Sequence, residues 1–169
     1  PAAPAPNGLH RVAWVPAPHR PDTADTPDPA GSVAVVGASL APEFHAPAHP
    51  DLAGLLAAVD AGAPAPRTVL AHFPPAGPEE ADPGALHRTA SAGLALAQEF
   101  LRHPALDGSR LVLLTRGALA TTPGAPVTDL AGATLWGLLR SAQTEHPGRF
   151  VLADAPAGTG LSGLPGLLR

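Results

Sequence analysis

The sequence contains no cysteine, methionine, lysine, tyrosine or isoleucine. The lack of cysteine excludes disulfide frameworks, thiol catalysis and cysteine-ligated zinc sites. The lack of lysine and tyrosine excludes Schiff-base chemistry on a lysine and acid catalysis by a tyrosine. All ten basic side chains are therefore arginines. Several classes of enzyme are excluded before any motif is considered.

Charge and hydropathy further limit the kinds of protein that this chain can be. The net charge is −4, the arginines are scattered, and only two tryptophans and four phenylalanines are present, so nucleic-acid binding is not expected. The longest apolar stretch, Leu130–Leu139, is about half as long as a membrane span, and no signal-peptide pattern precedes it. The 169 residues suit one soluble, cytoplasmic domain. The missing initiator methionine and the linker-like start indicate a piece of a longer polypeptide.

The domain is expected over residues 9–155. Residues 1–8 are rich in proline and alanine and predict a stiff, extended linker. Leu9–Val15 alternates in polarity and predicts a strand, which a surface loop over residues 16–31 follows. Residues 156–169, rich in glycine and proline, form a second linker or the start of a following segment.

Buried strands and amphipathic helices alternate along the domain. Nearly continuous apolar runs predict strands at Ser32–Ala38, Arg67–Phe73, Arg110–Arg116 and Arg149–Asp154. Apolar residues at three- and four-residue steps predict helices at Asp51–Asp60, Gly84–His103 and Asp129–His146, with Asp51 as an N-cap. This alternation predicts an α/β fold, a truncated Rossmann-like architecture with a mostly parallel sheet and helices on both faces.

One glycine motif suggests a dinucleotide site. Gly158, Gly160 and Gly163 form a G-x-G-x-x-G pattern shortly after the strand Arg149–Asp154. In dinucleotide-binding domains such glycines let a pyrophosphate approach a helix N-terminus. Here Pro156 and two alanines separate the motif from the strand, and Pro165 interrupts the helix that should follow. A linker or a frayed helix start is the competing interpretation.

Two further loop motifs have weak chemical interpretations. Ser39 follows a strand as in a degenerate nucleophile elbow, but Ala41 stands where the motif has its second glycine, so a simple turn is favoured. His45 and His49 are four residues apart, but Pro47 spoils the helical face that would bring both to one metal ion. We expect no metal site.

The remaining polar and aromatic candidates favour structural roles. Glu79, Glu80 and Asp82 lie among prolines and predict a solvated acidic loop that enters the next helix. Trp136 lies four residues before Arg140, on the edge of an apolar helix face. A packed tryptophan with the arginine over its ring is favoured over a ligand platform.

The last helix and strand resemble a known family. Residues 129–154 contain Trp-Gly-Leu-Leu-Arg-Ser-Ala-Gln at positions 136–143, and they resemble the ketoreductase structural subdomain of modular type I polyketide synthases. Leu9-His-Arg-Val-Ala-Trp-Val-Pro16 is similar to its opening strand. Residues 110–118 are similar to its characteristic strand and turn, and the preceding helix, ending Ala-Gln-Glu-Phe-Leu, has the matching position. The resemblance covers residues 8–155.

The resemblance implies a truncated, short-chain-dehydrogenase-like fold that does not itself hold a cofactor. In this family a following catalytic subdomain binds NADPH and carries the serine, tyrosine and lysine that reduce a β-keto group on an acyl carrier protein. The structural subdomain packs against that half and steadies it. The expected partners are therefore the catalytic subdomain of the same polypeptide and neighbouring polyketide synthase domains, within a multifunctional enzyme of antibiotic biosynthesis.

The chain departs from a complete reductase because it contains neither tyrosine nor lysine. We therefore expect no reductase activity from the chain alone. Two alternatives remain: a small nucleotide-binding domain that uses Gly158, Gly160 and Gly163, and a docking or dimerisation element whose edge strand Leu9–Val15 pairs with another chain.

Overall fold

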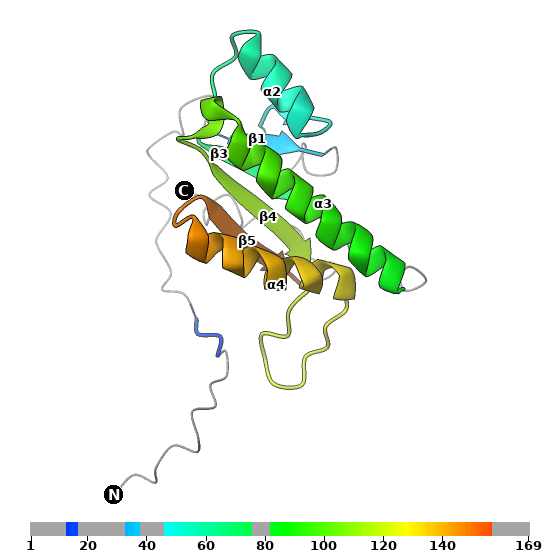
Figure 1. Cartoon of the computed structure of the whole chain (residues 1–169). Helices are drawn as coiled ribbons and strands as arrows, with labels where there is room; N and C mark the ends of the chain where they lie inside the picture. Colours follow the sequence, from blue (N-terminus) through cyan, green and yellow to red (C-terminus); the bar gives the residue numbers. More distant parts are fainter. Residues whose placement is uncertain (1–12, 17–32, 38–45, 76–81, 157–169) are drawn as a thin grey trace, which may run out of the picture.

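The computed structural model describes residues 13–16, 33–37, 46–75 and 82–156, which contain a five-stranded parallel sheet (Figure 1). Its strands are β1 Val33–Val36, β2 Ala48–His49, β3 Thr68–His72, β4 Arg110–Arg116 and β5 Phe150–Ala155. They lie in the order β2-β1-β3-β4-β5, and every neighbouring pair is parallel. The predicted α/β, Rossmann-like class is confirmed.

Three α-helices connect the strands of the described part. They are α2 Leu52–Asp60, α3 Pro83–Arg102 and α4 Leu130–Glu145, and a short 3-10 helix, η2 Pro104–Leu106, follows α3. The predicted boundaries agree to within one residue, because an aspartate begins each helix and Pro104 or the Pro147-Gly148 pair follows α3 and α4. The apolar periodicity and the capping residues thus determined these elements locally.

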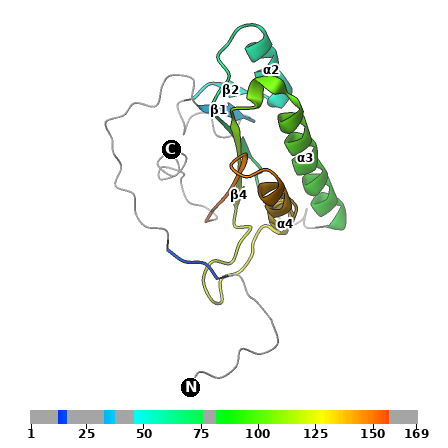
Figure 2. The same ribbon diagram turned by 60° about the vertical axis from the view of Figure 1, so that its left-hand side comes forward.

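The three α-helices that the structure describes all cover the same face of the sheet, so within the described residues the expected helices on both faces are not seen (Figure 2). From β2 the chain proceeds to β3, β4 and β5 in one direction across the sheet, whereas the step from β1 to β2 goes the opposite way. Successive right-handed crossovers in one direction place their helices on one side, and only a reversal of direction would change the side. The order of helices and strands along the sequence does not reveal in which direction each crossover steps across the sheet.

Two local predictions also need correction. The edge strand β2 was not predicted, because two residues, Ala48 and His49, are too few to show a period. Residues 13–15, the described part of the predicted strand Leu9–Val15, lie in no strand. They are exposed and contact the rest of the protein through Trp14 and α4. The alternating polarity is therefore not accompanied by strand pairing at residues 13–15, while residues 9–12 lie outside the described residues.

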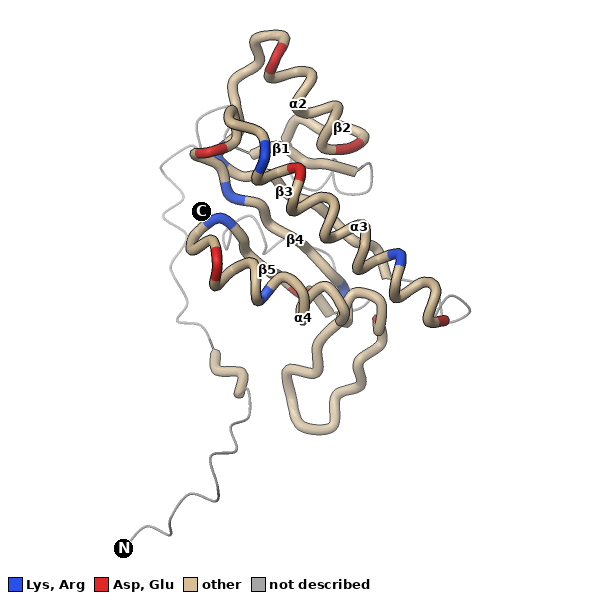
Figure 3. The backbone as a smooth tube through the Cα atoms, in the orientation of Figure 1, with Lys and Arg blue, Asp and Glu red and all other residues tan. Residues whose placement is uncertain are grey.

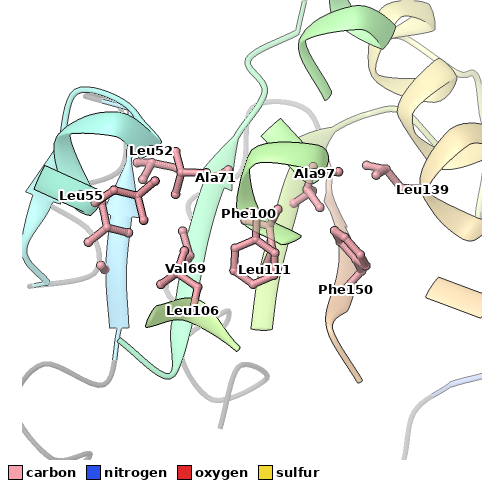
Figure 4. Packing of buried hydrophobic residues seen from close by; sticks show 14 of the residues in the cluster. Leu52, Leu55, Val69, Ala71, Ala97, Phe100, Leu106, Leu111, Leu139 and Phe150 are labelled. Atoms are coloured by element: carbon pink, nitrogen blue, oxygen red, sulfur yellow. The ribbon is translucent and has the colours of Figure 1, made fainter. Parts of the chain in front are cut away.

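The main hydrophobic core lies between the helices and the sheet (Figure 4). Leu52 and Leu55 of α2, Phe100 of α3 and Leu139 of α4 pack there against alternate strand residues. These strand residues are Ala34, Val36, Val69, Ala71, Leu111, Leu113 and Phe150. The intervening strand residues form a second buried cluster of Val35, Leu70, Val112, Leu114 and Ala155. Both faces of the sheet are thus apolar, as the continuous hydrophobic runs predicted.

Helices α3 and α4 approach closely at a glycine. A Cβ atom added to Gly93 would overlap Cδ2 of Leu135, and Leu135 is fully buried. Gly93 thus lets α3 and α4 pack closely side by side on the sheet.

Candidate functional site

The carboxyl edge of the sheet is where ligands bind in open α/β folds. The parallel strands end at this edge, and the connections into α3 and α4 leave from it. Backbone N–H groups at helix starts carry partial positive charge and attract phosphates or other anions. The carboxyl edge of the sheet is therefore the candidate functional site.

The chain's own carboxylates occupy the helix starts of the described part (Figure 3). Asp51 Oδ1 accepts a hydrogen bond from the Gly54 N–H at 2.8 Å, and Asp82 Oδ1 accepts one from the Ala85 N–H at 2.6 Å. The start of α4 repeats this arrangement in a buried setting. There Asp129, only 1% exposed, accepts from the Gly132 N–H at 2.9 Å. A phosphate at any of these starts would meet a negative charge already in place.

A fourth carboxylate, that of Asp154, accepts hydrogen bonds from the turn that follows β4. Its Oδ1 accepts hydrogen bonds from the Thr115 hydroxyl at 2.7 Å and the Ala118 N–H at 3.0 Å, while its Oδ2 accepts from the Leu119 N–H at 3.2 Å. Thr115 and Asp154 are direct partners in the register of β4 and β5. The two N–H groups after β4, which could otherwise face an anion, are thus bonded to a side chain of β5.

Gly117 closes the base of the connection between β4 and α4. Its φ of +72° lies in the left-handed region, where glycine is favoured. Its carbonyl accepts hydrogen bonds from the N–H groups of Thr128 and Asp129 at 2.9 and 3.0 Å. Residues 118–127 therefore form a loop whose two ends meet at Gly117. The same hydrogen bonds hold Asp129 in place at the start of α4.

Trp136 connects this edge to the outer side of α4. Its indole Nε1 donates a hydrogen bond to Thr115 Oγ1 at 3.0 Å, and the side chain is 9% exposed. The Trp14 ring packs edge-on against it at 6.0 Å between centroids. The Arg140 guanidinium carbon lies 5.6 Å from the Trp136 ring centroid and 5.9 Å from that of Trp14. The predicted packing of Arg140 over Trp136 is confirmed, with Trp14 as an additional member.

The structure places few of the other candidates at this edge. Gly158, Gly160, Gly163, Ser39, His45, Glu79 and Glu80 lie outside the described residues. His49 ends β2, and Asp82 caps α3. The described segments contain no group of three potential metal-ligating side chains. In those same segments, no helix combines the length and the apolar character that crossing a bilayer requires.

Sequence reasoning missed the hydrogen-bonded network of Thr115, Asp154 and Trp136. One signal was present, because Thr115 continues the alternation of Leu111 and Leu113 and Asp154 continues that of Phe150. Two polar residues at buried positions of neighbouring strands indicate a shared hydrogen bond. The register that brings them opposite each other follows only from the folded sheet.

The known proteins that this chain resembles are polyketide synthases. The family described as "Polyketide synthase extender module SpnB, Rossmann fold domain" matches residues 12–168. Polyketide synthase GfsB of Streptomyces halstedii is 43% identical over 155 residues, which cover 88% of this chain and 3% of that protein.

Two further relatives show the same relation of part to whole. Pikromycin polyketide synthase component PikAII of Streptomyces venezuelae is 44% identical over 124 residues, covering 67% of this chain and 3% of that protein. Mycoketide-CoA synthase of Mycobacterium tuberculosis is 70% identical over 47 residues, covering 28% of this chain and 1% of that protein. The chain therefore spans only a small part of the relatives that it matches.

Proposed function

Because the chain belongs to the Rossmann fold domain family of polyketide synthase extender modules, we propose that it is the non-catalytic structural subdomain of a ketoreductase. Its role is to pack against and stabilise a catalytic subdomain in the same polypeptide. That subdomain would bind NADPH and reduce the β-keto group of an acyl chain on an acyl carrier protein.

The observation that carries this proposal is the state of the carboxyl edge of the sheet. The described helix starts are capped by Asp51, Asp82 and Asp129, and the turn after β4 is bonded to Asp154. An edge held by the chain's own carboxylates suits a scaffold better than a pyrophosphate site. The absence of tyrosine and lysine from the chain also supports a division of labour, in which another subdomain supplies the acid and the cofactor contacts.

The first prediction concerns association with the catalytic half. Titration of this chain with the separately produced reductase half of the same synthase, followed by calorimetry, is expected to show binding with a Kd of about 1 µM or tighter. Interfaces between domains of one chain commonly bury about 600–1,500 Å², which is sufficient for such affinity. At about 100 times the Kd, the partner should stabilise this chain by about 2.7 kcal/mol. If no heat of association appears, the proposal is wrong.

The second prediction separates the scaffold from a nucleotide-binding domain. Titration of the chain alone with NADPH, monitored by nicotinamide fluorescence, is expected to give no saturable signal up to about 1 mM. Micromolar binding that Gly160→Asp abolishes would instead favour a site at Gly158, Gly160 and Gly163. Gly137→Asp, at an exposed position of α4, is the matched control for adding a carboxylate elsewhere.

A further inference from the structure

Trp14, Val15, Trp136 and Arg140 form a small surface beside α4, here called the Trp–Arg surface. Trp136 is nearly buried, whereas Trp14 is 43% and Val15 81% exposed. Arg140 is exposed and lies over both indole rings. Residues from before β1 and one side of α4 thus present a single patch of mixed apolar and cationic character.

Contacts with the two indole rings hold the Arg140 guanidinium in place. In the part of the chain that the structure describes, no hydrogen bond or ion pair reaches it. Some other arginines do use their donors, since Arg149 donates to the carbonyl oxygens of Ser109 and Leu106, and Arg110 donates to Thr68 Oγ1. Arg102 donates to Gln98 Oε1. Among the described residues, Arg140 therefore combines a fixed position with N–H groups that no partner takes up.

This combination is typical of the side chains that dominate protein interfaces. Tryptophan and arginine are enriched at the residues that contribute most to binding, and a guanidinium binds a carboxylate through two parallel hydrogen bonds. Contacts with two indole rings restrict Arg140 before a partner arrives, so less side-chain freedom is lost on binding. The exposed Val15 supplies apolar area next to the charge.

We propose that the Trp–Arg surface binds a carboxylate-bearing segment of the neighbouring catalytic subdomain in the same polyketide synthase. The occupant follows from charge complementarity, because a guanidinium that has no partner among the described residues and lies beside apolar groups is matched by an aspartate or glutamate flanked by apolar residues. It also follows from the size of the relatives, in which the segment that matches this chain makes up about 3% of the polypeptide, so that most of each relative is other sequence. The inference rests on the proposed function and locates one part of the interface.

The test repeats the calorimetric titration with variants at position 140. Arg140→Gln is expected to raise the Kd about 10-fold, and Arg140→Glu about 100-fold through repulsion of the partner's carboxylate. Arg140→Lys should restore only part of the affinity, because an ammonium group cannot form the two parallel hydrogen bonds. Raising the salt from about 50 mM to about 500 mM should weaken wild-type binding more than that of Arg140→Gln.

The control is a second exposed arginine on a helix. Arg102→Glu makes the same change of charge at the end of α3 and should leave the Kd within about 2-fold of the wild type. Circular dichroism should show all variants folded, because both side chains are exposed. Trp14→Ala, which removes one ring from beneath the guanidinium, should weaken binding about 10-fold.

The outcomes distinguish the two proposals. If the wild type binds and Arg140→Glu and Trp14→Ala bind equally well, the Trp–Arg surface is not the docking site, while the proposed function stands. If the wild type does not bind the catalytic half, the proposed function fails and this inference fails with it. If sedimentation shows that the chain alone dimerises and that Arg140→Glu dissociates the dimer, a second copy occupies the surface and the inference is overturned.

Discussion

Replacing Phe100 with alanine is expected to lower the free energy of unfolding by about 3–5 kcal/mol, the cost of removing a large aromatic side chain from a packed core. Phe100 is fully buried in the core between the helices and the sheet, and its ring meets Phe150 edge-on at 6.0 Å. The Arg149 guanidinium carbon lies 4.9 Å from the Phe100 ring centroid. One substitution thus removes contacts among α3, β5 and the turn before β5.

Urea unfolding followed by circular dichroism measures this effect through the midpoint of the transition. Leu94→Ala is the matched control, because Leu94 lies on the same helix but is 43% exposed. It should cost about 1 kcal/mol or less, since little of its area leaves water on folding. Equal losses for the two variants would contradict the assignment of Phe100 to the centre of the core. A loss of stability of this size is a large fraction of what a domain of this length has.

Replacing Gly132 with alanine is expected to destabilise the protein by about 2–3 kcal/mol, although alanine is the better helix former. Gly132 is in the first turn of α4, and an added Cβ would overlap Asp129 Oδ2 and lie 3.3 Å from the Cβ of Ala118. Asp129 is 1% exposed and cannot move into solvent without losing its capping hydrogen bond. The substitution therefore opposes the buried cap of α4.

Gly137→Ala provides the control on the same helix. Apart from its chain neighbours and the backbone of its own helix, no described atom lies within 4 Å of the position that its Cβ would take, and the residue is exposed. It should stabilise the protein by about 0.5–1 kcal/mol through helix propensity alone. Opposite signs for two glycine-to-alanine changes in one helix are the expected result. Stabilisation by Gly132→Ala would show that the buried cap at Asp129 is not rigid.

The two proposals about function share a physical basis. The carboxyl edge of the sheet is held together by the chain's own groups, with Asp154 bonded to the turn after β4 and Asp129 capping α4. Trp136 links this hydrogen-bonded edge to the surface beside α4, where Trp14 and Arg140 are exposed. A rigid scaffold that presents a fixed guanidinium is suited to hold another domain in position.

Local elements were predictable where one short-range signal determined them. The strand β4 coincides with its predicted range, because seven residues between turn signals leave no ambiguity. Helix α4 was predicted from its apolar period, with Asp129 and His146 now seen as its two caps. The edge strand β2 was missed, since its two residues follow the neighbouring strand and have no pattern of their own.

The candidate site was much less predictable than the elements. Trp136 and Arg140 were paired correctly because residues four apart on a helix are neighbours. Trp14 is 122 positions before Trp136, and its contact depends on how the segment before β1 returns to α4. The role of Asp154 was not predicted, because in the sequence it is only the last residue of an expected strand. In the fold its carboxylate accepts three hydrogen bonds.

The sequence by itself determined the order of the elements, the apolar character of the sheet and the absence of a tyrosine–lysine reductase site, because each depends on residue type or short-range spacing. The tertiary structure decided that α2, α3 and α4 share one face, that Thr115 meets Asp154, and that Trp14 and Arg140 meet beside α4. These features depend on the direction of the crossovers and on the strand register. Both arise from packing between residues far apart in the chain, to which no local pattern is sensitive.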